Sequence, residues 1–519
     1  MPNLAVVFGP PGTGKTTELA RLARQYVDDE GSDSVLLCAY TKTAARELAG
    51  RDLPLEPHQV GTLHSHCYHA LDRPTIAEPA YQEWNEANPL YPLSRQKSPL
   101  AADDPGGSTP GTIADEYLNQ INVLRHRLVP EDRWPYPEQL FWKLWQKWKH
   151  ERGYLDFTDL IDRARFVVPV APGRPATIIA DEAQDLSLLQ WDLLTRWGRH
   201  ATRVIAAGDD DQALYRWCGA DFRPLLAAPQ RRVLPQSYRV PRRLQAWATR
   251  YAESIQQRHP KTWESRAEEG TLLHEGGTWE APDMVIARLT AWLEEPWGTY
   301  ACIAPCSYML EPLIEALEQE GLPFSNRWRP HRRDWNPLAP PAKGVGIMQR
   351  LLDFARPPDR LWSWQELATW VPLIRADGVL RRKAKTHVTL HADEAKPCTM
   401  GDLEDLFLPG QLDGALRGDL HWLADNLLQS RAKALAYPLR VYRRFGREGL
   451  LEMPRITIGT AHSLKGAEAD TVVFWQDLSR AQRVALCEGG EGADDVYRML
   501  YVACTRARET LIVIGGNHG

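Results

Sequence analysis

Residues 9–16 read Gly9-Pro10-Pro11-Gly12-Thr13-Gly14-Lys15-Thr16, after the apolar run Leu4–Phe8 and before the helically spaced stretch Lys15–Tyr26. This order of strand, glycine-rich turn and helix matches a phosphate-binding loop. The glycines let backbone N–H groups turn toward phosphates, and the helix start adds the positive end of its dipole. We expect the loop through Thr17 to bind ATP, with Lys15 at the β- and γ-phosphates and Thr16 on Mg²⁺. The loop alone predicts an NTPase, because kinases and switch GTPases share it.

A second acidic motif strengthens that prediction. The apolar stretch Ile178–Ala180 runs directly into Asp181 and Glu182. Adjacent carboxylates at the end of a buried strand suit metal-assisted hydrolysis, with Asp181 in the Mg²⁺ shell and Glu182 polarising the attacking water. Read alone, the segment could be an acidic helix start. Beside a complete phosphate-binding loop, the catalytic interpretation is favoured.

The chain alternates apolar runs with helically spaced stretches, which predicts α/β architecture with parallel sheets and ligands at the carboxyl ends of the strands. In the first part the expected strands are Ser34–Tyr40, Ala176–Ala180 and Arg203–Ala207, with a helix at Thr43–Ala49. In the second part we expect strands at Tyr300–Pro305, Ile456–Thr460, Thr471–Trp475 and Thr510–Ile514, and a helix at Glu311–Glu320.

Two segments interrupt the alternation and are predicted to be mostly helical insertions. The first contains a connector, Asp103–Gly111, and a Trp-rich helix, Phe141–Lys149, whose tryptophans we assign to core packing in preference to nucleic-acid contact. The expected segments are a first motor domain in two parts, 1–73 and 154–235, with an insertion at 74–153, and a second motor domain in two parts, 236–326 and 454–519, with an insertion at 327–453.

The composition is that of a globular protein with more than one domain. The chain has 519 residues, of which 43% are hydrophobic and 25% charged, and its net charge is −5. No overall positive field indicates nucleic-acid binding, although a locally basic groove can coexist with an acidic exterior. The eight cysteines are scattered, without the spacing of a zinc or iron–sulfur site. With no signal peptide or long apolar run, we expect a cytoplasmic protein without a membrane partner.

Further motifs, in order along the chain, carry a family resemblance. Asp181–Asp185 and Gly208–Trp217 resemble motifs II and III of the UvrD/Rep/PcrA group of superfamily 1 DNA helicases. The other matches are Tyr40–Ala45 (motif Ia), Gly61–Ser65 (motif Ib), Asp156–Leu160 (the return to the first motor domain), Gln236–Arg239 (motif IV), Thr460–Glu468 (motif V) and Tyr501–Arg508 (motif VI). The resemblance implies two RecA-like P-loop motor domains that use ATP and Mg²⁺.

The resemblance also implies roles for single residues. Gln212 would sense the γ-phosphate, Arg239 and Arg506 would act as arginine fingers, and Glu468 would contact the ribose or nucleotide. Single-stranded DNA would lie along residues in or beside the matched motifs, namely Tyr40, Thr41, Thr62, His64, Tyr215, Trp217, Tyr238 and His462. Aromatic faces stack on any base, so binding should tolerate sequence. For Tyr40 and His64, core packing is an equally good interpretation.

The chain departs from the family at a few points. The family's glutamine motif, which reads adenine upstream of the phosphate loop, has no room before Leu4, and Cys218 stands where an arginine is common. We expect a helicase or translocase that moves 3′→5′ on single-stranded DNA and unwinds junctions with duplex, in repair, replication or recombination. The alternative is a DNA-stimulated ATPase that needs a partner such as a nuclease or replication factor to unwind. A non-catalytic scaffold is disfavoured by the intact ATP motifs.

Overall fold

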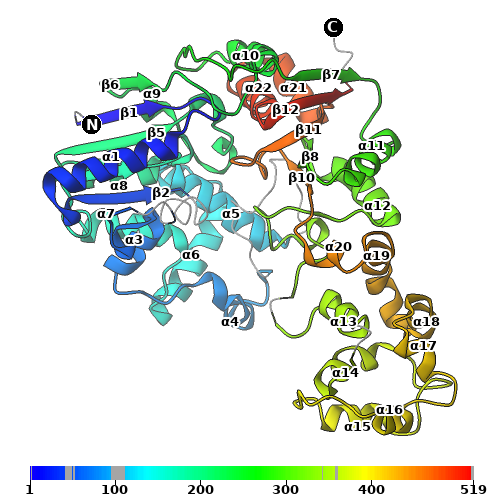
Figure 1. Ribbon diagram of the computed structural model, residues 1–519. Helices are drawn as coiled ribbons and strands as arrows, with labels where there is room; N and C mark the ends of the chain where they lie inside the picture. Colours follow the sequence, from blue (N-terminus) through cyan, green and yellow to red (C-terminus); the bar gives the residue numbers. More distant parts are fainter. Residues whose placement is uncertain are drawn as a thin grey trace. The chain divides into compact units, whose positions relative to one another are not determined.

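The structure is a computed structural model that describes residues 1, 3–40, 50, 53–94, 111–341, 343–356 and 360–515 (Figure 1). The expected helix Thr43–Ala49, the DNA-contact candidate Thr41 and residues 103–110 of the expected connector lie outside the described residues.

The first sheet is parallel, with strand order β3-β2-β4-β5-β1-β6. The strands are β1 (Leu4–Phe8), β2 (Val35–Ala39), β3 (Val60–Thr62), β4 (Thr177–Ala180), β5 (Arg203–Gly208) and β6 (Gln230–Val233). β1 pairs with β5 from Leu4↔Val204 to Phe8↔Gly208. The phosphate loop and the segment after β5 therefore both begin at the carboxyl ends of the strands. The motif after β4 begins at the carboxyl ends of the strands as well, because β4 also pairs in parallel with β5.

Alternating side chains of these strands face two separate cores, as the period of a strand requires. Val6, Ile178 and Val204 pack with α3 (Leu63–Ala70), α7 (Phe157–Val167) and α8 (Leu188–Gly198). Val7, Ile179 and Ile205 pack with α1 (Lys15–Glu30) on the other face. Figure 1 shows α1 along its face of this sheet. The short helix α9 (Arg223–Leu226) precedes β6.

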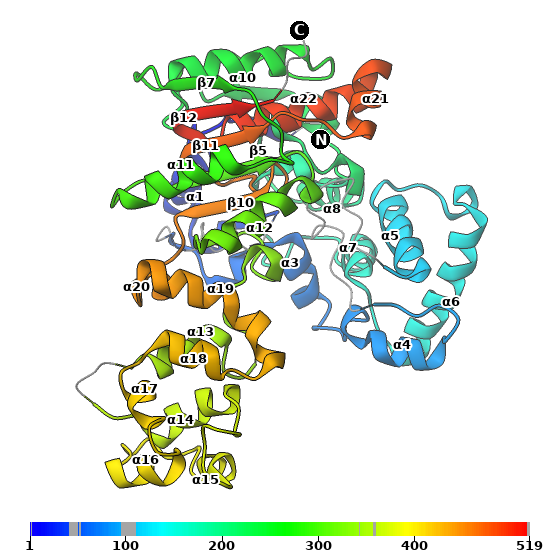
Figure 2. The same cartoon turned by 90° about the vertical axis from the view of Figure 1, so that its right-hand side faces the viewer.

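The first insertion forms its own aromatic core, and the prediction of core packing for its tryptophans is confirmed. Trp84 of α4 (Tyr81–Ala87) meets Trp145 and Trp148 of α6 (Tyr136–Arg152) at ring-centroid distances of 5.0 and 5.6 Å. α5 (Ile113–His126) adds Leu118 to the same cluster. Figure 2 shows α4, α5 and α6 gathered into one lobe.

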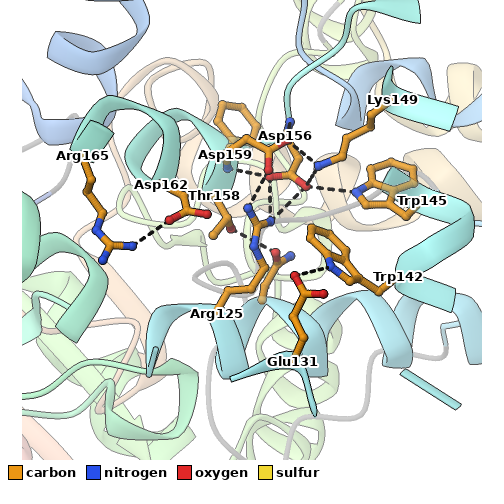
Figure 3. A network of polar contacts seen from close by, with 12 residues as sticks. Arg125, Glu131, Trp142, Trp145, Lys149, Asp156, Thr158, Asp159, Asp162 and Arg165 are labelled. Atoms are coloured by element: carbon orange, nitrogen blue, oxygen red, sulfur yellow. Dashed lines mark hydrogen bonds and ion pairs between the residues drawn. The ribbon is translucent and has the colours of Figure 1, made fainter. Parts of the chain in front are cut away.

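A buried ionic network joins this insertion to the first motor domain (Figure 3). Asp156 begins α7 in a capping box with Asp159, a common way to start a helix. Arg125 of α5 donates to Asp156 Oδ1 at 2.9 Å and to Asp159 Oδ1 at 2.6 Å. Lys149 of α6 bonds both carboxylates, and Trp145 Nε1 donates to Asp156 Oδ2 at 3.0 Å. Two cations therefore neutralise the two carboxylates where the chain re-enters the sheet.

The second sheet has the order β7-β12-β11-β8-β10-β9. Its strands are β7 (Thr271–Glu275), β8 (Tyr300–Ala304), β9 (Phe324–Ser325), β10 (Ile456–Thr460), β11 (Ala469–Trp475) and β12 (Ala507–Ile514). The accompanying helices are α10 (Arg242–Ser254), α11 (Asp283–Glu294), α12 (Glu311–Glu320), α21 (Arg480–Glu488) and α22 (Gly490–Cys504). The predicted α/β class with two parallel sheets and helical insertions is thereby confirmed.

The second insertion is also helical among its described residues. Its helices are α13 (Ile347–Phe354), α14 (Trp364–Trp370), α15 (Ala384–Leu390), α16 (Met400–Leu406), α17 (Leu412–Leu416), α18 (Leu420–Asn426), α19 (Gln429–Phe445) and α20 (Glu448–Leu451). By compactness the chain divides into one unit of residues 1–276, 303–308 and 460–519 and another of 277–302 and 309–459. In the part of the chain that the structure describes, no helix has the length and apolar character to cross a bilayer.

Candidate functional site

Glycines set the backbone conformation of the phosphate loop, and the side chain of Lys15 spans it. Gly12 and Gly14 have φ of 73° and 75°, in the left-handed region that glycine adopts at little cost. Lys15 Nζ donates to Gly9 O at 3.0 Å, and a Cβ on Gly9 would lie 1.9 Å from Lys15 Cγ. Thr13 Oγ1 donates to Pro10 O at 2.8 Å and tightens the turn. The loop thus presents backbone N–H groups and one ammonium, which is the cradle that phosphates require.

Oxygen donors that suit Mg²⁺ converge beside the loop. Thr16 Oγ1, in the first turn of α1, lies 3.5 Å from Asp181 Oδ2 at the end of β4. A hydroxyl and a carboxylate are hard oxygen ligands of the kind that Mg²⁺ takes together with phosphate oxygens. The two predicted metal ligands are therefore brought together by the sheet, although 165 residues separate them.

Glu182 is placed to act as a base. Its backbone adopts a left-handed conformation with φ of 50°, and its carboxylate lies 3.9 Å from Lys15 Nζ. Burial alone would raise the pKa of Glu182. The positive charges of Lys15 and Lys465 outweigh burial and hold that pKa below its ordinary value. Glu182 is consequently ionised at neutral pH and can accept a proton from water.

Gln212 and Arg506 meet directly. Gln212, after β5, donates through Nε2 to Asp209 Oδ2 at 2.6 Å and accepts at Oε1 from Arg506 Nη2 at 3.0 Å. Arg506 lies between α22 and β12 and is buried. Burial and the neighbouring Arg239 lower the pKa of Arg506 to about 9, which still leaves it protonated at neutral pH. Gln212, the predicted γ-phosphate sensor, and Arg506, a predicted arginine finger, thus form one hydrogen-bonded pair although 294 residues separate them in the sequence.

The motif IV segment lies against the phosphate loop. Tyr238 N donates to Gly12 O at 2.8 Å, and Ser237 Oγ donates to Pro11 O at 2.7 Å. A Cβ on Gly12 would lie 2.3 Å from the Cβ of Arg239, so this approach requires glycine at position 12. Arg239 Nε bonds Glu468 Oε2 at 2.7 Å. The second predicted finger and the predicted nucleotide contact are therefore paired beside the loop.

Four of the predicted DNA-contact residues gather in one small cluster. The ring of Tyr215 lies 6.0 Å from that of Tyr40 and 6.3 Å from that of His462, measured between centroids. Tyr215 Oη also donates to His462 O at 2.9 Å. Trp217 is partly buried against the same cluster. Tyr215 and His462 are themselves buried, so Tyr40 and Trp217 offer the more accessible rings.

The other predicted DNA-contact residues are placed differently. Thr62 Oγ1 accepts from Ser65 N at 3.1 Å and caps α3. His64 is half-buried, and burial lowers its pKa to about 4, so it is neutral at physiological pH. Tyr238 has an exposed ring beside the phosphate loop, apart from the aromatic cluster. Thr17, which was predicted to bind ATP and not DNA, is exposed on the first turn of α1.

Sequence reasoning missed the polar links between motifs. Gln184 hydrogen-bonds Glu182 through Nε2 and accepts from Asp209 N at 3.1 Å through Oε1. Lys465 Nζ donates to both oxygens of Asp185, at 2.7 and 2.5 Å. Buried polar side chains a few residues after a buried strand, here Gln184 and Asp185, were a signal that partners exist. The identity of Lys465 as a partner could not be read from the sequence, because it lies 280 residues away.

Comparison with known proteins agrees with this geometry. A family profile described as an AAA domain matches residues 1–217. The YjcD protein of Bacillus subtilis is 22% identical over 237 residues, covering 42% of this chain and 31% of that protein. ATP-dependent DNA helicase PcrA of Bacillus subtilis is 27% identical over 289 residues, covering 50% of this chain and 39% of PcrA. PcrA of Staphylococcus aureus (strain COL) is 23% identical over 295 residues, covering 52% of this chain and 40% of that protein.

The chain spans about a third to two fifths of the length of these curated relatives. The region matched by the family profile, residues 1–217, contains the phosphate loop after β1 and the motifs after β4 and β5. These matches and the geometry of the site support a likeness of the chain to UvrD/PcrA-like superfamily 1 helicases.

Proposed function

We propose that the chain is an ATP-hydrolysing motor that moves 3′→5′ along single-stranded DNA and unwinds duplex at junctions, in DNA repair, replication or recombination. The observation that carries the ATPase part is the 3.0 Å hydrogen bond between Gln212 and Arg506. It joins the segment after β5 to the segment before β12, which supports a joint role for Gln212 as γ-phosphate sensor and Arg506 as arginine finger. The direction of movement rests on resemblance to the 3′→5′ branch of the family.

The residues divide the work of hydrolysis between binding and proton transfer. Lys15 and the N–H groups of the loop bind the phosphates of ATP, while Thr16 and Asp181 would hold Mg²⁺. When bound, the metal ion neutralises charge on the transferred phosphoryl group. Glu182, held ionised by Lys15, orients the attacking water and takes its proton.

Two arginines from the proposed second motor domain complete the site. Arg506, oriented by Gln212, and Arg239, oriented by Glu468, supply positive charge where negative charge grows on the γ-phosphate. An arginine finger of this kind is worth ~10³–10⁵ in rate. Because both arginines come from beyond residue 235, closure of these segments on ATP and their release after hydrolysis provide a stroke.

Two contacts can carry that stroke to DNA. Asp185 lies three residues after Glu182 and bonds Lys465, which lies three residues after His462 of the aromatic cluster. Tyr215 also bonds His462 directly. Bases stacked on Tyr40 and Trp217 would gain ~1–3 kcal/mol each without sequence preference. A change at the carboxylate motif therefore reaches the proposed DNA track through one ion pair.

The test is strand displacement on three labelled substrates: a duplex with a 3′ tail, one with a 5′ tail and one with blunt ends. We expect ATP-dependent release from the 3′-tailed duplex alone, and none with Glu182→Gln. Release from the 5′-tailed duplex instead would contradict the proposed direction. DNA-stimulated hydrolysis without release from any substrate would support the partner-dependent ATPase, with a nuclease or replication factor as the partner.

A further inference from the structure

Three consecutive carboxylates precede the γ-phosphate sensor, and one buried lysine binds all of them. Asp209, Asp210 and Asp211 follow β5 and are buried. Lys261 Nζ lies 3.1 Å from Asp209 Oδ1, 2.5 Å from Asp210 Oδ1 and 2.9 Å from Asp211 Oδ2. The side chain of Lys261 is 1% exposed. Such a lysine is costly to bury, so its retention needs a compensating interaction, and the three carboxylates supply it.

Neighbouring residues of the same segment complete the cluster. Arg258 donates to both oxygens of Asp211, at 2.8 and 2.7 Å, and His259 N donates to Asp210 Oδ2 at 2.6 Å. Three carboxylates thus face two cationic side chains. Without Lys261, the carboxylates would repel one another in a region that water does not screen.

Asp209 links this cluster of carboxylates to Gln212, the proposed γ-phosphate sensor. Asp209 uses its two oxygens differently, because Oδ1 faces Lys261 while Oδ2 accepts from Gln212 Nε2 at 2.6 Å. A carboxylate only accepts, and the guanidinium of Arg506 only donates. Gln212 must therefore direct its NH₂ toward Asp209 and its oxygen toward Arg506, as the 3.0 Å contact shows. The orientation of the sensor amide depends on where Asp209 is held.

The segment that contains Lys261 also packs against Phe8, the residue before the phosphate loop. The ring of His259 stacks on Phe8 at a centroid distance of 4.5 Å, and Lys261 Nζ lies 5.4 Å from the centroid of the same ring. Phe8 is the last residue of β1, directly before Gly9. Residues 258–261 therefore pack between the strand that leads into the phosphate loop and the turn that leads into Gln212.

We propose that Lys261 is a positioning residue for ATP hydrolysis: it fixes Asp209, and through Asp209 it fixes the Gln212 amide against Arg506. The proposal rests on the ATPase function proposed above. The contacts described for Lys261 are with Asp209, Asp210, Asp211 and the ring of Phe8, so its loss should affect the transition state more than the binding of nucleotide.

The test compares Lys261→Met, which keeps length and removes charge, with Lys261→Arg and Gln212→Ala. The matched control is Lys147→Met on α6, whose side chain is 74% exposed. Two quantities are measured: steady-state kcat and KM for ATP with single-stranded DNA, and affinity for Mg²⁺-ADP with and without aluminium fluoride, which mimics the transferred phosphoryl group. A melting curve for each variant reports folding.

For Lys261→Met we expect kcat to fall about ten-fold or more, with affinity for ADP alone within about two-fold of wild type. The gain in affinity that aluminium fluoride gives the wild type should be lost, and Lys261→Arg should recover part of it. Adding Lys261→Met to Gln212→Ala should cost little more than Gln212→Ala alone, because both act on one interaction.

Three results would overturn the proposal: wild-type kcat and fluoride response in Lys261→Met, losses that add fully to those of Gln212→Ala, or the same losses in Lys147→Met. If Lys261→Met does not fold, Asp209→Asn decides, since its single side-chain oxygen cannot serve both Lys261 and Gln212. Asp209→Asn should then lose the fluoride response, and retaining it would overturn the proposal. A wild type without ATPase activity would instead contradict the proposed function.

Discussion

At the scale of single residues, Arg506 spreads its guanidinium over several acceptors. Nε donates to Val502 O at 2.9 Å, Nη1 to Ala467 O at 3.3 Å and Nη2 to Gln212 Oε1 at 3.0 Å. An ammonium is a point charge that cannot reproduce this planar fork. We predict that Arg506→Lys lowers the DNA-stimulated kcat by ~10³-fold or more while KM for ATP changes little.

The control for that prediction is Arg243→Lys on α10. The side chain of Arg243 is 65% exposed and pairs only loosely with Glu269, at 3.5 Å. Its replacement should leave kcat unchanged. An Arg506→Lys variant with near wild-type kcat would show that this guanidinium does not act on the reacting phosphate.

Tyr238 presents a second question at this scale. Its ring is 74% exposed and its N–H bonds Gly12 O, so it offers an open aromatic face at the phosphate loop. An aromatic face stacks on any base, whether of DNA or of the nucleotide. Because of its place beside Gly12, we predict that Tyr238→Ala raises KM for ATP several-fold and leaves DNA affinity unchanged. Trp217→Ala should do the reverse. Weaker DNA binding by Tyr238→Ala would contradict this and support the DNA contact predicted for Tyr238 from the sequence.

At the scale of elements, the sequence predicted the central strands of both sheets and missed the edges. The expected strand Leu4–Phe8 and the expected helix Glu311–Glu320 have the bounds observed. The strands not predicted are β3, β6, β7 and β9, which are the four edge strands. β6 reads Gln-Arg-Arg-Val and is largely exposed, and β9 has two residues. An edge strand buries too little surface to impose the apolar run by which a central strand is recognised.

The network between the first insertion and α7 gives a prediction for stability (Figure 3). Asp156→Asn would remove a buried negative charge and leave Arg125 and Lys149 with their ion pairs to Asp159. Breaking a buried pair costs ~3–5 kcal/mol, which a denaturant titration would measure as a lower free energy of unfolding. Asp162→Asn is the matched control, because Asp162 is 44% exposed and its loss should cost ~1 kcal/mol or less. Equal effects of the two variants would contradict the role assigned to the network.

At the scale of the whole molecule, His126 should contribute a loss of stability on mild acidification. His126 bonds Ser187 Oγ at 2.9 Å, and burial, followed by the charges of His64 and Arg125, lowers its pKa from 6.5 to about 3. Above pH 6.5 His126 is neutral in the folded and the unfolded chain, so its contribution is fully present. As the pH falls below 6.5 only the unfolded chain takes up the proton, and stability is lost progressively toward pH 3.

We predict that lowering the pH from 7.5 to 5.5 costs the wild type ~1 kcal/mol through His126, and that His126→Asn removes this part of the dependence. Urea titrations of both proteins at the two pH values measure it. The same pH dependence in both would show that His126 is not the group responsible.

The residues of the nucleotide site were easier to predict from the sequence than the ion pairs that surround them. Lys15, Thr16, Asp181 and Glu182 lie in short local patterns next to strands, so the sequence shows their chemistry and the sheet brings them together. Lys261 lies in no such pattern, and motif V contains Lys465 without indicating its partner. Only the folded chain brings these two lysines to the carboxylates that they bind. Three consecutive aspartates, Asp209–Asp211, are a sequence signal of counter-charges, but they do not identify which residues supply them.

The most direct test of the central claim is the steady-state ATPase rate with and without single-stranded DNA, for the wild type beside Glu182→Gln. The carboxamide keeps the shape of Glu182 but cannot take a proton from water. We predict strong stimulation of the wild type by DNA, and loss of turnover in Glu182→Gln with ATP binding retained. A wild-type rate that DNA does not change, or a Glu182→Gln variant as fast as the wild type, would contradict the assignment of this site as a DNA-driven ATPase.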